Sequence, residues 1–141
     1  MFVNWSDEKH AIGIPDIDAQ HRELFLITNR LWEDHEKPDQ QTLLRPLLKR
    51  LYAYTRYHFS TEEGMFRHYG YEAIAPHLHI HTGFTDRIRT YLQETRDGRA
   101  VNYNEILDTM VNWILFHIAG EDQKYAAWFL SLIHISQGIV R

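Results

Sequence analysis

The sequence contains no cysteine, and this absence narrows the chemistry that the chain can carry out. Without cysteine there is no disulfide framework, no thiolate nucleophile, no sulfur-ligated zinc and no iron–sulfur cluster. Any metal ion bound by this protein must therefore be held by imidazole and carboxylate groups.

Long apolar runs and basic runs are also missing. No stretch approaches the roughly 20 apolar residues that a membrane-spanning helix needs, and residues 1–20 lack the basic start and apolar middle of a signal peptide. The formal net charge is -4, so neither nucleic acid nor an anionic membrane is expected as a partner. We therefore expect a cytoplasmic protein.

The chain has 141 residues, which predicts a single domain spanning residues 1–141. Hydrophobic residues make up 44% and charged residues 24%, as is usual for a soluble globular protein. Ten histidines are the one compositional excess.

Apolar residues recur at helical spacing in four segments, and no segment alternates as a strand would. Residues 1–17 predict an irregular arm. The first helix is expected to begin after Asp18, whose carboxylate can cap it, and to end near residues 37–39. The second is expected to run to about Tyr69 and to be closed by Gly70. Because proline is tolerated only in a first turn, this helix should begin no more than about four residues before Pro46.

The third helix is expected to open with Pro76 in its first turn and to run to about Thr95. Asn102 or Asn104 could cap the fourth helix, and residues 125–135 could prolong it or form a short extra helix. Short links between four helices predict an all-α fold: an antiparallel up-down-up-down four-helix bundle over about residues 18–122, with an N-terminal arm and a C-terminal tail.

Seven potential metal ligands share helix faces with core residues. They are His21, His58, Glu62, His77, His81, His117 and Asp122. Taken singly, each is more often a core or surface residue than a ligand. Taken together, carboxylates buried among imidazoles would cost several kcal/mol unless they are paired or bind metal. The pattern therefore predicts a site for two metal ions. The remaining histidines fit neither the faces nor the spacings, and we assign them no role.

The spacing of these residues along the helices supports the prediction in two cases and raises a problem in the third. His58 and Glu62 are four residues apart, as are His77 and His81, so each pair lies on one helix face. His117 and Asp122 are five apart, which on a regular α-helix separates them by about 140°. We therefore predict a local widening, or π-turn, near residues 119–120.

Four strings carry a resemblance to a known family. They are DAQH (18–21), HFSTEE (58–63), HLHIHTGF (77–84) and WILFHIAGEDQKY (113–125). Together with Trp5 and the segment IGIPDID (12–18), they closely resemble the bacterial hemerythrins over nearly the whole chain. The resemblance implies two irons, bridged by Glu62, by Asp122 and by an oxygen atom. Three histidines would hold one iron: His77, His81 and His117. Two would hold the other: His21 and His58.

The function that the resemblance implies is reversible dioxygen binding. Three imidazoles and three bridging atoms fill six positions on one iron, whereas two imidazoles leave one position open on the other for dioxygen. The protein would then be a carrier, store or local supplier of oxygen, and not an enzyme. Ile114 lies one turn before His117 and is the candidate for the pocket wall, with Phe59, Phe84 and Trp113 completing it. Ordinary core packing is the alternative for Ile114.

Other functions remain open at this point. An oxygen or nitric oxide sensor would need a separate output partner. Five apolar tail residues could form its docking surface, although packing in the core is the favoured role for them: Trp128, Phe129, Leu130, Leu132 and Ile133. A di-iron oxidase or peroxidase would be expected to use a carboxylate-rich site with Glu-x-x-His motifs. A zinc store fits poorly, because zinc prefers four ligands. We expect a monomer. The sequence does not identify a client enzyme that would use the oxygen.

Overall fold

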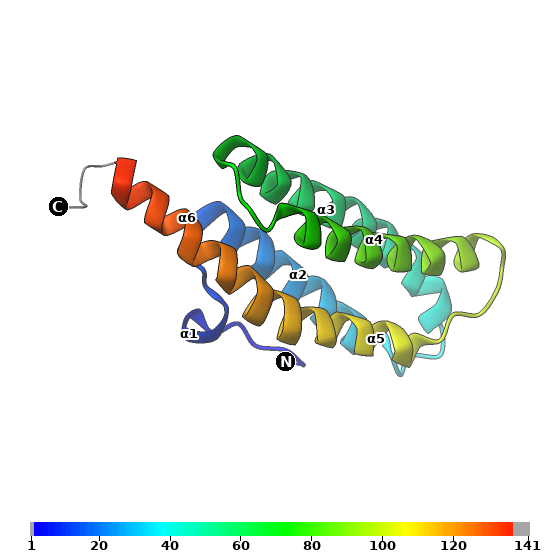
Figure 1. Cartoon of the computed structure of the whole chain (residues 1–141). Helices are drawn as coiled ribbons and strands as arrows, with labels where there is room; N and C mark the ends of the chain where they lie inside the picture. Colours follow the sequence, from blue (N-terminus) through cyan, green and yellow to red (C-terminus); the bar gives the residue numbers. More distant parts are fainter. Residues whose placement is uncertain (1, 137–141) are drawn as a thin grey trace.

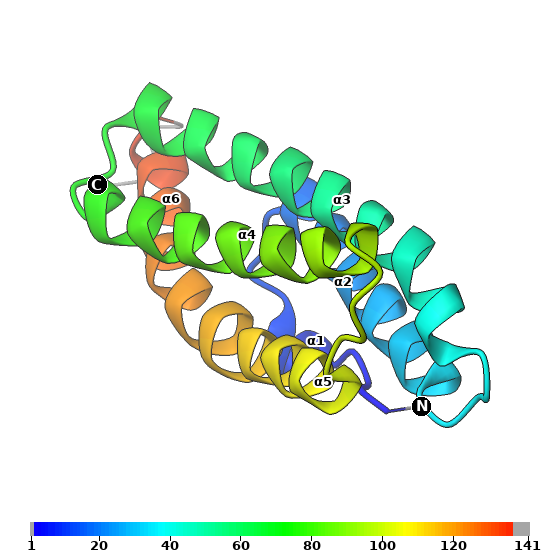
Figure 2. The same ribbon diagram turned by 90° about the vertical axis from the view of Figure 1, so that its right-hand side faces the viewer.

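The chain folds into an elongated antiparallel four-helix bundle (Figures 1 and 2). The computed structural model describes residues 2–136, and of residues 133–136 only the backbone. Three sides of the bundle are α2 (Pro15–Asp34), α3 (Gln40–Tyr69) and α4 (Ile74–Arg96). The fourth is a continuous rod of α5 (Tyr103–Asn112), the π-helix η1 (Trp113–Glu121) and α6 (Asp122–Ser136). The predicted all-α bundle is confirmed, and the described residues contain no strand.

The start of α2 differs from the prediction. The helix begins at Pro15, whose missing N–H costs nothing at a first helical position, so Asp18 lies inside the helix and does not cap it. Its carboxylate accepts hydrogen bonds from the Ile12 N–H (2.8 Å) and the Gly13 N–H (3.3 Å). Asp18 thus ties the arm to the helix. The arm also contains a short helix, α1 (Asp7–His10), where none was expected.

The other helix ends follow local rules, with one exception. Gly70 closes α3 in the left-handed region (φ 71°), and the Asn102 side chain caps α5 by accepting from the Glu105 N–H. Pro76 lies in the first turn of α4, as expected. The exception is Pro46. Since α3 begins at Gln40, Pro46 lies six residues inside the helix, and the expected limit of about four residues is wrong.

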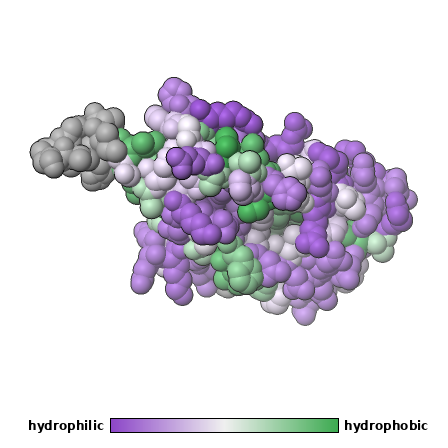
Figure 3. Space-filling view, viewed as in Figure 1, coloured by the Kyte–Doolittle hydropathy of each residue, from purple (hydrophilic) through white to green (hydrophobic). Residues whose placement is uncertain are grey.

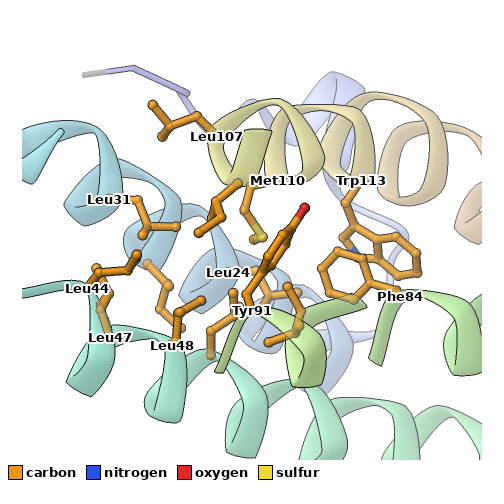
Figure 4. Close-up of a cluster of buried hydrophobic side chains, with 14 of the residues drawn as sticks. Leu24, Leu31, Leu44, Leu47, Leu48, Phe84, Tyr91, Leu107, Met110 and Trp113 are labelled. Atoms are coloured by element: carbon orange, nitrogen blue, oxygen red, sulfur yellow. The ribbon is translucent and has the colours of Figure 1, made fainter. Parts of the chain in front are cut away.

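Two apolar clusters fill the bundle. The larger one contains buried side chains from all four rods, among them the leucines and aromatic rings in Figure 4. The smaller one, at the other end, consists of Ile12, Ile17, Phe66, Tyr125 and Ala126. Most of the face in Figure 3 is hydrophilic, with small apolar patches between. No helix in the described part of the chain is long and apolar enough to span a membrane.

The fourth rod contains the predicted helical irregularity. The π-turn expected near residues 119–120 is confirmed and extends over nine residues, Trp113–Glu121. After it, α6 prolongs the rod and projects past the end of the bundle (Figure 1). The tail residues suggested for docking are partly covered: Trp128, Phe129, Leu130 and Leu132 are half-buried, while the Ile133 side chain lies outside the described residues.

Candidate metal centre

The bundle brings all seven predicted ligands together in its interior. α2 contributes His21, α3 contributes His58 and Glu62, α4 contributes His77 and His81, η1 contributes His117, and α6 contributes Asp122. None of the seven side chains is more than 4% exposed. They lie between the two apolar clusters, because His77 packs on Phe66 and Tyr125 while His81 packs on Phe59.

The seven side chains form two overlapping groups that share the Glu62 carboxylate. One group is Glu62 with three histidines, His77, His81 and His117, and the other is Glu62 and Asp122 with His21 and His58. Within each group the potential ligand atoms lie within 4.8 Å of one another. Asp122 also reaches the first group, since its Oδ1 lies 3.0 Å from His117 Nε2 and 3.3 Å from His77 Nε2. Both carboxylates therefore stand between the two sets of histidines.

The spacing and the missing hydrogen bonds of these atoms fit metal ligands. Bonds of about 2.1 Å place neighbouring ligands of a six-coordinate ion about 3.0 Å apart, and the imidazole–carboxylate separations here are 3.0–3.3 Å. Several of the buried atoms have no hydrogen-bond partner within the described chain: Nε2 of His77, His81 and His117, Oε1 of Glu62, and both oxygens of Asp122. Leaving so many polar atoms unsatisfied is costly. Two cations would satisfy them all, so the residues present fit such a pair.

The π-helix explains how His117 and Asp122 reach the same site. Bonding from residue i to i+5 brings residues five apart onto one face, whereas a regular α-helix would turn Asp122 away. The resulting separation of Asp122 Oδ1 from His117 Nε2 is 3.0 Å. The irregular segment thus brings together two candidate ligands that a regular helix would separate.

Hydrogen bonds behind the rings set the orientation of two histidines. His58 Nδ1 donates to Gln20 Oε1 (2.7 Å), and His81 Nδ1 donates to Glu63 Oε2 (3.0 Å). Since Nδ1 carries the proton in both rings, each Nε2 presents its lone pair to the centre. The Gln20 amide is itself oriented, because its Nε2 donates to the Thr61 hydroxyl (3.3 Å).

Sequence reasoning missed three residues of this site. Besides Gln20 and Glu63, the fully buried Tyr125 donates its hydroxyl proton to Glu62 Oε2. A positional signal was available for each. Gln20 precedes His21, Glu63 follows Glu62, and Tyr125 comes three residues after Asp122, one helical turn along.

The electrostatics of the site favour a cation. Burial alone raises the pKa of Asp122, but His117, His21 and His77 outweigh it and hold this pKa well below its usual range. Burial likewise opposes ionisation of Glu62, whose pKa is nevertheless lowered by His58 and His81. Burial raises the pKa of Tyr125, and the charge of Glu62 adds to the effect. The centre therefore holds two ionised carboxylates and a protonated phenol.

The four residues predicted to line a ligand pocket are all buried. Three of them form an aromatic stack with ligand histidines, in which Phe59 lies 3.7 Å from His81, Trp113 lies 3.8 Å from His117, and Phe84 lies 4.0 Å from Trp113, measured between ring centroids. The rings therefore lie against the three-histidine group. Ile114 is 2% exposed and belongs to the larger apolar cluster.

Fold and site together define a helical-bundle protein with paired imidazole and carboxylate sites for two cations. The sequence matches the family described as "Hemerythrin HHE cation binding domain" over residues 12–129. The chain therefore belongs to this hemerythrin family.

Curated relatives agree with this assignment, and a solved structure shares the fold. The chain is 33% identical over 129 residues to a bacteriohemerythrin of Clostridium acetobutylicum, covering 89% of this chain and 98% of the relative. It is 30% identical over 122 residues to a bacteriohemerythrin of Stenotrophomonas maltophilia, and this match covers 86% of this chain and 78% of the relative. A crystal structure of wild-type hemerythrin matches the fold with a TM-score of 0.84 at 20% identity, covering 90% of this chain and 97% of that one.

Proposed function

We propose that this protein binds dioxygen reversibly at a non-haem di-iron centre, for oxygen carriage, storage or delivery. The observation that carries the proposal is the unequal division of the histidines, three in one group and two in the other, around shared carboxylates. Imidazole with carboxylate is a donor set that suits iron.

In this proposal His77, His81 and His117 hold one iron, and His21 and His58 hold the other. Glu62 and Asp122, which stand between the two sets of histidines, would be shared by both ions. Because the second position has one imidazole fewer, it would keep a place for dioxygen. When bound, the two irons supply the two electrons that reversible oxygen binding requires.

The protein's own residues favour binding over oxidation chemistry. The ligands are at most 4% exposed, so the fold keeps bulk water from the centre. We propose that Ile114 forms the pocket wall beside the open position, while Phe59, Phe84 and Trp113 enclose the centre on the side of the three-histidine group. Such apolar side chains offer no proton for cleaving the O–O bond. Oxygen-activating bundles use carboxylate-rich sites with Glu-x-x-His motifs, whereas this site has five histidines and two carboxylates.

The experiment that tests the function is optical spectroscopy of protein loaded with ferrous iron without oxygen, exposed to air and then returned to vacuum. A charge-transfer band that appears in air and vanishes under vacuum is expected. Immediate conversion to a stable ferric spectrum would instead favour an oxidase or sensor, and protein that holds no iron would refute the centre itself. In the same assay, Ile114→Ala should speed autoxidation, and an unchanged rate would remove Ile114 from the pocket.

A further inference from the structure

We propose that Glu63 and Gln20 add to the difference that three histidines against two already make between the two metal positions, with Glu63 acting as a positioning residue that strengthens His81 as a ligand. The inference rests on the ligand assignment of the proposed function and goes beyond it. It assigns different metal affinities and reduction potentials to the two positions and names two residues outside the seven that contribute to the difference.

The two contacts are alike in geometry and differ in charge. His81 Nδ1 donates to a Glu63 carboxylate oxygen at 3.0 Å, and His58 Nδ1 donates to the Gln20 amide oxygen at 2.7 Å. The amide cannot rotate freely, because its nitrogen donates to Thr61, whose hydroxyl proton goes to the Tyr57 carbonyl. A neutral oxygen is therefore held against His58, whereas His81 meets a carboxylate.

This difference in charge changes the ligand strength of the opposite ring nitrogen. A carboxylate draws the Nδ1 proton toward itself and increases the electron density on Nε2, which makes a better metal ligand than an imidazole bonded to an amide. Within the described chain, Nδ1 of His21 and of His117 is buried without any hydrogen-bond partner. Glu63 is therefore the one anionic partner that the described residues provide to an Nδ1 of the centre.

The two contacts also differ in their access to solvent. The Glu63 side chain is 23% exposed, and its other oxygen lies 3.7 Å from the mostly exposed Arg67 guanidinium. Gln20 is only 6% exposed. An ion pair as exposed as that with Arg67 is weak, so the carboxylate charge acts mainly on His81. Arg67 consequently offers a matched control, since it touches Glu63 without touching a ligand.

Two consequences follow for a loaded centre. The three-histidine position should bind the first ion, because it has the additional imidazole and the stronger His81. It should also favour the more highly charged ferric ion, so its reduction potential should be the lower of the two. A tenfold change in the preference for ferric over ferrous ion corresponds to 59 mV for one electron.

The test is a titration of the full chain with cobalt(II), in which calorimetry and visible absorption measure the two binding steps. Glu63→Gln keeps the hydrogen bond and removes the charge, and it should weaken the tighter binding step about tenfold. Gln20→Glu adds the charge on the other side and should tighten the weaker step. Arg67→Gln should leave both steps unchanged. In iron-loaded protein, spectroelectrochemistry should show the lower potential raised by Glu63→Gln and the higher one lowered by Gln20→Glu.

The outcomes separate this inference from the function it rests on. Unchanged binding steps and potentials in Glu63→Gln, with both disturbed in Glu63→Ala, would mean that Glu63 acts through the hydrogen bond alone, and the inference would be overturned. In that case the two ions would still bind and the proposed function would stand. Wild-type protein that binds fewer than two cobalt ions would overturn the ligand assignment itself, and the inference with it.

Discussion

Among single residues, Tyr125 decides how one of the two buried carboxylates of the centre is held. Its phenol donates to Glu62 Oε2, while Glu62 Oε1 faces His58 at 3.2 Å and His81 at 3.2 Å. The phenol therefore satisfies one oxygen of a fully buried carboxylate and leaves the other free for the centre. The ring also packs on Phe66 and His77, so it is part of the smaller apolar cluster.

Replacing Tyr125 by phenylalanine keeps this packing and removes the hydrogen bond. Because Glu62 Oε2 would be left buried without a partner, we expect the free energy of unfolding to fall by about 1–3 kcal/mol. Urea unfolding at equal metal loading measures the change. Tyr71→Phe is the matched control in the same cluster, since the Tyr71 hydroxyl makes no hydrogen bond within residues 2–136. Equal losses in both variants would show that the bond to Glu62 contributes nothing.

At the element scale, two irregularities in otherwise regular helices have different consequences. The π-helix η1 places His117 and Asp122 on one face and therefore serves the centre. Pro46 in α3 serves no such purpose in the structure. It is exposed, and the helix passes through it because the neighbouring Leu44, Leu47 and Leu48 are buried in the larger cluster. The lost hydrogen bond to the Thr42 carbonyl is thus outweighed by packing.

The position of a proline within its helix should determine the sign of its effect. Pro46→Ala restores a hydrogen bond inside α3, and we expect it to raise the free energy of unfolding by about 1–2 kcal/mol. Pro76→Ala restores no hydrogen bond, because residue 76 lies in the first turn of α4. It makes the unfolded chain more flexible, so we expect it to lower the free energy of unfolding by up to about 1 kcal/mol. Both prolines are exposed, so the free energies of unfolding of the two variants, measured with denaturant, can be compared directly. A stabilised Pro76→Ala would contradict this account.

At the scale of the whole molecule, the centre and the fold depend on each other. Every rod of the bundle contributes at least one of the seven ligand side chains, and these are buried between the two apolar clusters. In the absence of cations, folding must bury two carboxylates among imidazoles whose lone pairs converge. Ions that bind only the folded chain therefore shift the folding equilibrium toward it.

We expect ferrous iron, added without oxygen, to raise the melting temperature of the protein, and to raise it further as the free iron concentration exceeds the dissociation constant. A free concentration of about 100 times the dissociation constant should contribute about 2.7 kcal/mol per site. Thermal melts and iron analysis, with two ions expected per chain, measure the effect. His21→Ala should lose part of the stabilisation, whereas His79→Ala, an exposed residue between two ligands, should keep it all. Equal behaviour of these two variants would contradict the assignment.

The expectations from sequence failed where competing local preferences had to be weighed. Asp18 is a good cap in isolation, but Pro15 starts the helix earlier, and the carboxylate then bonds to the Ile12 and Gly13 amides. Pro46 ought to lie near a helix start, yet buried leucines on both sides extend α3 beyond it. In both cases the outcome depended on contacts with other segments, which local rules do not contain.

The pattern along the chain is sufficient to predict the helical architecture, the seven side chains that meet inside it, and the irregularity between His117 and Asp122. Periodicity dictates which residues share a face, and a five-residue spacing cannot lie on one face of a regular helix. The packing of the helices sets which histidines lie beside the two carboxylates, that Tyr125 bonds to Glu62, and that His81 is paired with Glu63 while His58 is paired with Gln20. These contacts join different helices, so they depend on how the rods are rotated and shifted against one another, which the pattern along a single helix does not specify.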